Sequence, residues 1–102
     1  MAQFDVYEYT GGLPAVTHVL DVQCKGLAML DTRVVVPLVP EALFGKRLSR
    51  VNPVLTVFGQ RLVMATSELV AIEKNKLVTA VANLESSRHE IKAAYDFIAD
   101  GF

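Results

Sequence analysis

The feature that most restricts the fold of this chain is the apolar run at residues 34–39, Val-Val-Val-Pro-Leu-Val. A continuous run rich in β-branched residues is typical of a strand that is buried on both faces. Pro37 has no backbone N–H to donate, so the run predicts a bulge or a sheet edge at that position. We therefore expect a mainly β protein with this strand in its interior.

Two further segments predict a hairpin before this strand. Residues 3–9 and 16–22 are rich in β-branched and aromatic residues, and residues 3–9 alternate between the two faces of a strand. Residues 10–14 between them read Thr-Gly-Gly-Leu-Pro, which supplies glycines that tolerate positive φ and a proline with fixed φ. After this hairpin, residues 23–33 lose their periodicity and predict a long loop that carries Leu27, Met29 and Leu30 outward.

A second hairpin is predicted after the apolar run. Residues 40–44 favour a short helical turn ended by Gly45, and residues 46–52 favour a solvated loop. Residues 54–57 and 61–66 then flank a short glycine-containing connection at 58–60. This spacing is typical of two antiparallel strands joined by a tight turn.

Residues 67–84 permit two interpretations. Alanines, glutamates and lysines favour a helix by propensity, and only Asn75 interrupts the pattern. Residues 71–77 also suit an edge strand, because lysines on an edge discourage further pairing. The residues alone leave both interpretations open.

The end of the chain, residues 85–102, predicts an amphipathic helix. Ser87 followed by Glu90 matches a capping box, in which two side chains satisfy amides at the helix start. An apolar stripe at i, i+3, i+4 and i+7 predicts the face that packs on the core, and it comprises Ile91, Ala94, Tyr95 and Ile98.

Three residues near the end of this helix lie outside that stripe, and they are Phe97, Gly101 and Phe102. They have no core partner that the pattern guarantees. The helix therefore either closes the core only, or also presents these residues to a second protein.

Composition limits the class of protein. A chain of 102 residues fits one domain, residues 1–102. The hydrophobic fraction of 52 % and mean hydropathy of +0.35 are high for a small protein, so we expect a homodimer that hides apolar surface between subunits. Ten basic and 11 acidic residues nearly balance, which argues against direct binding of nucleic acid.

Location and cofactors are also constrained. The longest apolar run is far shorter than the roughly 20 residues that a membrane-spanning helix needs, so we expect no membrane association. The single cysteine, Cys24, cannot form an internal disulfide, which fits a reducing, cytoplasmic compartment. His18 and His89 have no partners at metal-ligand spacing, so we expect no metal, no cofactor and no catalytic residue. Asp31 with Arg33 in the loop is the one pair that suggests phosphodiester cleavage.

The order of several motifs resembles the CcdB toxin family. These motifs are Phe4-Asp-Val-Tyr7, Leu20-Asp-Val-Gln23, Arg33-Val-Val-Val-Pro-Leu38 and Glu90-Ile-Lys-Ala-Ala94, followed by Gly101 near the end. The resemblance spans residues 3–102. It implies an SH3-like barrel of mostly antiparallel strands, a small second sheet, and a terminal helix near the two-fold axis of a homodimer. It also favours strand for residues 67–84.

The resemblance implies a function in which the protein itself breaks no bond. The family binds the A subunit of DNA gyrase, traps the cleaved-DNA complex, and is neutralised by the antitoxin CcdA. The implied gyrase-binding residues are Gly26, Leu27, Asp96, Ala99, Asp100, Gly101 and Phe102. Asp100 stands where the best-known member has tryptophan, Ala99 replaces a large aromatic residue, and Gly26 replaces an aliphatic one. The alternatives are an mRNA endonuclease of the related Kid/MazF fold, using Asp31 and Arg33, and an interaction module without activity on gyrase.

Overall fold

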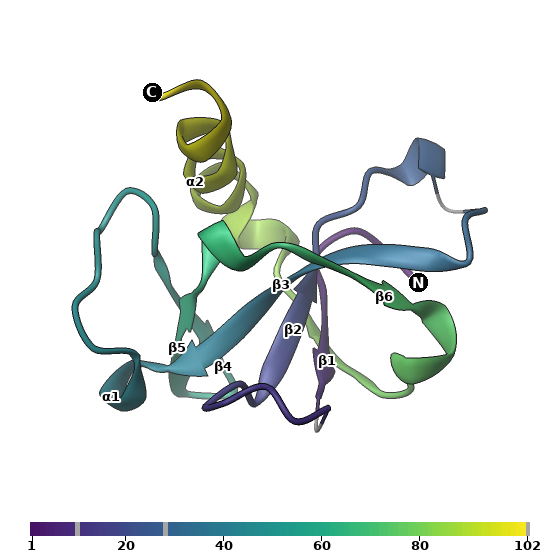
Figure 1. The fold of residues 1–102 in the computed structure, drawn as a ribbon, viewed down its shortest axis with the longest axis horizontal. Helices are drawn as coiled ribbons and strands as arrows, with labels where there is room; N and C mark the ends of the chain where they lie inside the picture. The colour runs from purple at the N-terminus through teal and green to yellow at the C-terminus, as the bar shows by residue number, and fades with distance from the viewer. Residues whose placement is uncertain (10, 28, 102) are drawn as a thin grey trace.

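The computed structural model describes residues 1–9, 11–27 and 29–101. Within these residues, seven strands form one curled, half-barrel sheet in the order β4-β5-β3-β2-β1-β7, and β6 branches from β3 (Figure 1). The strands are β1 (Asp5–Glu8), β2 (His18–Asp21), β3 (Thr32–Pro40), β4 (Val54–Val57), β5 (Gln60–Met64), β6 (Val70–Glu73) and β7 (Ala80–Asn83). The helices and 3-10 turns are η1 (Lys25–Leu27), α1 (Glu41–Phe44), η2 (Thr66–Glu68), η3 (Lys74–Lys76), η4 (Glu85–Ser87) and α2 (Arg88–Asp100).

The predicted mainly β fold with a terminal helix is confirmed. The pairings of β1 with β2, β2 with β3, and β4 with β5 are antiparallel, as both hairpins required. In the second hairpin the turn residues Phe58 and Gly59 both have positive φ, 49° and 78°, which matches the twist of the flanking strands. The small second sheet that the resemblance implied is not separate among the described residues, because β6 branches from β3 and belongs to the same sheet.

β3 is the central strand, and the position of Pro37 explains how one side of it pairs with both β5 and β6. Residues Thr32–Val35 pair with β6, and residues Leu38–Pro40 pair with β5. Pro37 lies between these two ladders, and its carbonyl accepts a hydrogen bond of 2.9 Å from the Ala65 N–H on that side. The missing N–H of proline therefore falls where the partner strand changes. The expected bulge or edge is in fact this change of partner.

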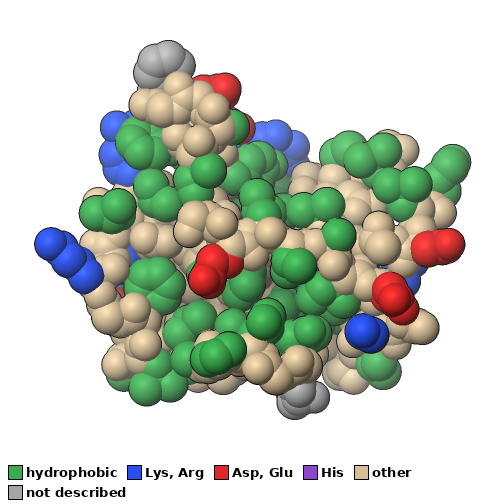
Figure 2. Space-filling view, in the orientation of Figure 1, with side chains coloured by type: hydrophobic (Ala, Val, Ile, Leu, Met, Phe, Trp, Pro, Cys, Tyr) green, Lys and Arg blue, Asp and Glu red, His purple; other side chains and the backbone are tan. Residues whose placement is uncertain are grey.

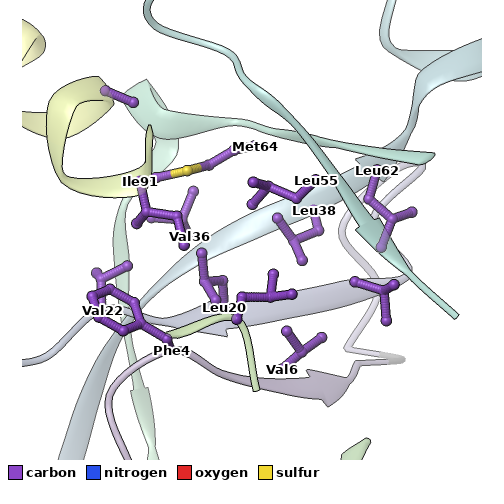
Figure 3. Packing of buried hydrophobic residues seen from close by; sticks show 13 residues of the cluster. Phe4, Val6, Leu20, Val22, Val36, Leu38, Leu55, Leu62, Met64 and Ile91 are labelled. Atoms are coloured by element: carbon purple, nitrogen blue, oxygen red, sulfur yellow. The ribbon is translucent and has the colours of Figure 1, made fainter. Parts of the chain in front are cut away.

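Side chains of β3 point into two cores on opposite faces of the sheet. Val36 and Leu38 enter the larger core, and Val35 enters the smaller one. Figure 3 shows the larger core, where Ile91 of α2 lies beside Met64 and Val36. The smaller core comprises Tyr7, Val19, Val35, Ile72 and Leu77.

Residues 67–84 contain two strands rather than one helix. The edge-strand interpretation of residues 71–77 is confirmed for residues 71–73 and wrong for the rest, because Lys74–Lys76 forms the 3-10 turn η3. Tertiary structure overrides helix propensity here, because β6 forms backbone hydrogen bonds with β3 and buries Ile72. β7 then pairs with β1 at the other side of the sheet.

Two expectations for the terminal helix are wrong. Ser87 is the N-cap residue of α2, but its side chain makes no capping hydrogen bond, so the capping box with Glu90 is not formed. The chain enters α2 through η4 instead, where the Asn83 side chain accepts a 2.9 Å hydrogen bond from the Glu85 N–H. Ile98 is 41 % exposed, because the helix runs past the edge of the core at that point.

Candidate functional site

The loop between β2 and β3 is closed by the side chain of Gln23. Its amide nitrogen donates to the Leu27 carbonyl at 2.6 Å, and its amide oxygen accepts from the Val34 N–H at 2.9 Å. Gln23 is buried, so both bonds are shielded from water. The glutamine of the Asp-Val-Gln motif therefore fixes the path of the loop.

The aspartate of the same motif holds the base of the loop, where β2 ends and β3 begins. Asp21 is buried, and its carboxylate accepts hydrogen bonds from the Gln23 N–H at 3.0 Å and from the Arg33 Nε at 2.7 Å. A second guanidinium nitrogen of Arg33 lies 2.7 Å from the same carboxylate. Charge-assisted bonds of this geometry are short and strong. The pair connects the two strands at the point where the loop begins and ends.

This arrangement separates the two residues on which the endonuclease interpretation depends. Arg33 is 1 % exposed and is bound to Asp21, whereas Asp31 is exposed. A guanidinium that is buried in an ion pair has no access to a phosphodiester. Asp31 and Arg33 therefore do not form the cleavage pair that the sequence suggested.

A buried tyrosine borders the ion pair. Burial, followed by the negative charges of Asp5 and Asp21, raises the pKa of Tyr7 to about 12. Its hydroxyl donates to the Asp5 carboxylate at 3.4 Å. The Tyr7 phenol therefore stays protonated over the whole physiological pH range.

The loop presents its apolar side chains to solvent, as predicted. Leu27 and Leu30 are both about half exposed, and Met29 is 86 % exposed. Gly26 lies in the 3-10 turn η1 and is exposed, and a side chain added there would meet open space. The loop residues of the candidate site are therefore accessible.

The helix residues of the candidate site lie on the last turns of α2. Asp96, Ala99, Asp100 and Gly101 are exposed, and Phe102 lies outside the described residues. Gly101 has φ 80° and ψ 9°, and its N–H donates to the Phe97 carbonyl at 2.8 Å. This left-handed geometry suits glycine and ends the helix abruptly.

A single chain does not bring the two parts of the candidate site together. In Figure 1, α2 stands at the left of the picture and η1 at the right, with the sheet between and below them. Both project from the same side of the sheet. A continuous surface that contains both parts therefore requires a second copy of the chain or a partner that spans the gap.

Residues that the sequence interpretation missed lie in the loop at 46–52. Its Asn52 is buried, and its side-chain amide donates to the Met64 carbonyl at 3.0 Å. Arg50 from this loop places its guanidinium carbon 4.4 Å from the centre of the Phe97 ring on α2. The Asn52-Pro53 pair is a recognisable turn signal, which could have pointed to Asn52. No sequence pattern links Arg50 to Phe97.

The described part of the chain offers neither a metal-binding cluster nor a membrane-spanning helix. Among residues 1–9, 11–27 and 29–101, no group of three or more His, Cys, Asp or Glu side chains has the geometry to hold a metal ion. No helix in the same residues has the length and apolar character needed to cross a membrane.

Comparison with known proteins places the whole chain in one family. The family model described as CcdB protein matches residues 3–101. The matched region includes every strand and all of α2. No curated protein matches the chain.

Proposed function

The chain belongs to the CcdB family, and from this premise we propose that it binds the A subunit of DNA gyrase, traps the gyrase complex with cleaved DNA, and is neutralised by a CcdA-like antitoxin. Membership of the family supports assignment to the toxins of toxin–antitoxin modules. The observation that carries the finer proposal is exposure: all described positions implied in gyrase binding are exposed. None of them is needed to close either core.

The proposed active form is a homodimer. The loop at 23–31 and the end of α2 stand apart in one chain (Figure 1). A two-fold axis that runs along the direction in which both project would place two loops and two helix ends on one face. Exposed apolar residues on the loop, including Leu27 and Met29, supply surface that such an assembly or its target can cover.

Trapping requires no chemistry from the toxin itself. A ligand that binds one state of its target more tightly than another shifts the population toward the preferred state. A toxin that binds only the gyrase conformation with open DNA would therefore hold the DNA break open. The free energy of this shift is the difference in affinity between the two gyrase states.

The end of α2 implies a polar contact with the target. Asp96 and Asp100 are exposed there, and Figure 2 shows acidic atoms near the free end of the helix. Carboxylates of this kind bind arginine through charge-assisted, bidentate hydrogen bonds. A tryptophan at the position of Asp100 would instead act through buried area and cation–π contact. We propose that this chain binds a basic patch on gyrase.

A supercoiling and cleavage assay with purified gyrase tests the proposal. The wild-type protein should inhibit supercoiling and accumulate cleaved DNA, and a variant that lacks residues 100–102 should do neither while it keeps its fold. The matched control is Phe58→Ser, because Phe58 is 83 % exposed on the β4–β5 turn, outside the candidate site. This control should inhibit as the wild type does.

Calorimetry with a gyrase A fragment separates binding from trapping. Binding without inhibition would contradict the trapping mechanism, and absence of binding would contradict gyrase as the target. A deletion variant that inhibits as well as the wild type would show that the end of α2 is not the site. Cleavage of RNA by the purified protein would support the endonuclease alternative instead.

A further inference from the structure

Arg50 lies where the loop at 46–52 meets the last turns of α2. Together with Ser49 and Pro53 it forms one wall of a groove whose other wall is α2. The Arg50 guanidinium carbon lies 4.4 Å from the centre of the Phe97 ring. Phe97 is only partly buried, and Arg50 covers one face of its ring.

The loop that carries Arg50 is held firmly. The Asn52 side chain accepts from the Leu48 N–H at 3.3 Å and donates to the Met64 carbonyl at 3.0 Å. The Arg47 guanidinium donates to the Asn52 carbonyl at 3.1 Å. The Thr66 hydroxyl donates to the Val51 carbonyl. Arg50 is therefore presented from a turn that is fixed to β5 and η2.

Phe97 is also part of the helix end. Its carbonyl accepts the N–H of Gly101, which is the bond that closes the left-handed cap of α2. Ile98, Ala99 and Asp100 follow Phe97 and are exposed, so the larger core does not restrain them. A force that fixes Phe97 also fixes the last turn.

Charge points in the same direction. Within the described helix, the last turn contains no basic residue, although a cation there would complement the helix dipole. Asp96 and Glu90 line the same groove as Arg50. Arg50 thus places a positive charge from the neighbouring loop beside these two carboxylates and the Phe97 ring.

We infer that Arg50 is a positioning residue, which holds the Phe97 ring and so fixes the direction in which Asp100 and Gly101 meet the target. The inference rests on the proposed function of the helix end. It assigns to Arg50 no contact with the target itself.

A double-mutant cycle tests this inference by calorimetry with the gyrase A fragment. Arg50→Gln should weaken binding about 2–5-fold, the range that corresponds to an exposed cation–π contact. Arg50→Lys should restore most of the affinity, because a lysine ammonium also binds an aromatic face. In a Phe97→Leu background, Arg50→Gln should have no further effect. If the loss of affinity in the double variant equals the product of the losses in Arg50→Gln and Phe97→Leu, Arg50 does not act through Phe97 and the inference is wrong.

The matched control is Lys46→Gln, which removes one exposed positive charge from the same loop. It should leave affinity unchanged, since Lys46 does not line the groove with α2. An equal loss of affinity in this control would show that net charge, and not the ring contact, matters.

A second measurement on the free protein does not depend on gyrase. Amide order parameters of residues 97–101 should fall in Arg50→Gln and stay unchanged in Lys46→Gln. Unchanged order in Arg50→Gln would overturn the positioning role. If the wild type fails to bind the gyrase A fragment, the proposed function fails, and the order parameters still decide whether Arg50 positions the helix end.

Discussion

The two exposed parts of the candidate site are anchored by opposite kinds of interaction. The loop at 23–31 rests on a buried polar network in which Asp21, Gln23 and Arg33 bind one another and the backbone. The last turns of α2 extend from apolar packing by Ile91 and Ala94, both fully buried. A buried ion pair demands specific partners, whereas apolar packing demands only volume and shape. The two parts should therefore respond differently to substitution and to pH.

The largest expected effect is loss of the polar anchor. Asp21→Ala should lower the free energy of unfolding by about 3–5 kcal/mol, because it leaves the buried Arg33 guanidinium without its counter-charge. Urea denaturation measures this loss. An Asp21→Ala, Arg33→Met double variant should recover much of it. If the double variant is no more stable than the single one, the pair is not the anchor.

The apolar anchor should give the next largest effect. Ile91→Ala should lower the free energy of unfolding by about 2–5 kcal/mol, the range for a truncated buried isoleucine. Ile98→Ala, seven positions along the same helix, should cost less than about 1 kcal/mol, because Ile98 is already largely exposed. Equal denaturation midpoints for the two variants would contradict the boundary between anchor and exposed end.

Tyr7, which borders the polar anchor, should give a pH dependence at high pH. The pKa of Tyr7 is raised from its ordinary value near 10 to about 12, so the folded state binds the phenolic proton more tightly than the unfolded state. Its contribution is complete below pH 10 and is lost as pH rises through 12, up to about 3 kcal/mol.

Tyr7→Phe isolates this contribution. The difference in unfolding free energy between the wild type and Tyr7→Phe should change between about pH 10 and 12 and stay constant below about pH 9. A difference that is flat over the whole range would show that the Tyr7 hydroxyl is not held protonated in the fold.

Apart from the Ile98→Ala comparison, the smallest expected effect is at Gly101. Gly101→Ala should cost about 1–2 kcal/mol, because an alanine at φ 80° is strained even though its side chain meets open space. Thermal unfolding measures the stability term, and calorimetry with the gyrase A fragment measures the change in binding. A larger loss in binding than in stability would sharpen the distinction between anchor and exposed end.

Local patterns predicted the elements whose partners lie close in the sequence. Both hairpins and the buried strand around Val36 follow from periodicity and from turn residues that lie between neighbouring segments. The prediction of a capping box at Ser87 was wrong because the 3-10 turn η4 leads directly into α2: the Arg88 N–H donates to the Glu85 carbonyl, and Asn83 caps the start of η4. The prediction that Ile98 packs on the core was wrong, because helical periodicity shows which residues share a face but not where along the helix the core ends.

Contacts between distant segments were beyond the reach of sequence patterns. The Asp-Val-Gln motif supported the resemblance to the family, but the role of Asp21 depends on Arg33, which the sequence placed with Asp31 in a solvated loop. The contact of Arg50 with Phe97 joins a loop and a helix whose mutual position only the folded sheet defines. Charge along the chain carries no information about such pairs.

The pairing of β1 with β7 ties completion of the sheet to a segment that is synthesised late. Asp5 pairs with Asn83, and the Asn83 side chain donates to the Asp5 carboxylate at 2.9 Å across 78 positions of sequence. Closing so long a loop carries a large entropic cost, and contacts of high sequence separation slow folding. A growing chain cannot complete the sheet or dock α2 until residues beyond 83 have been added. We therefore expect chains that stop before β7 to fold incompletely, because β1 then lacks one of its two partner strands.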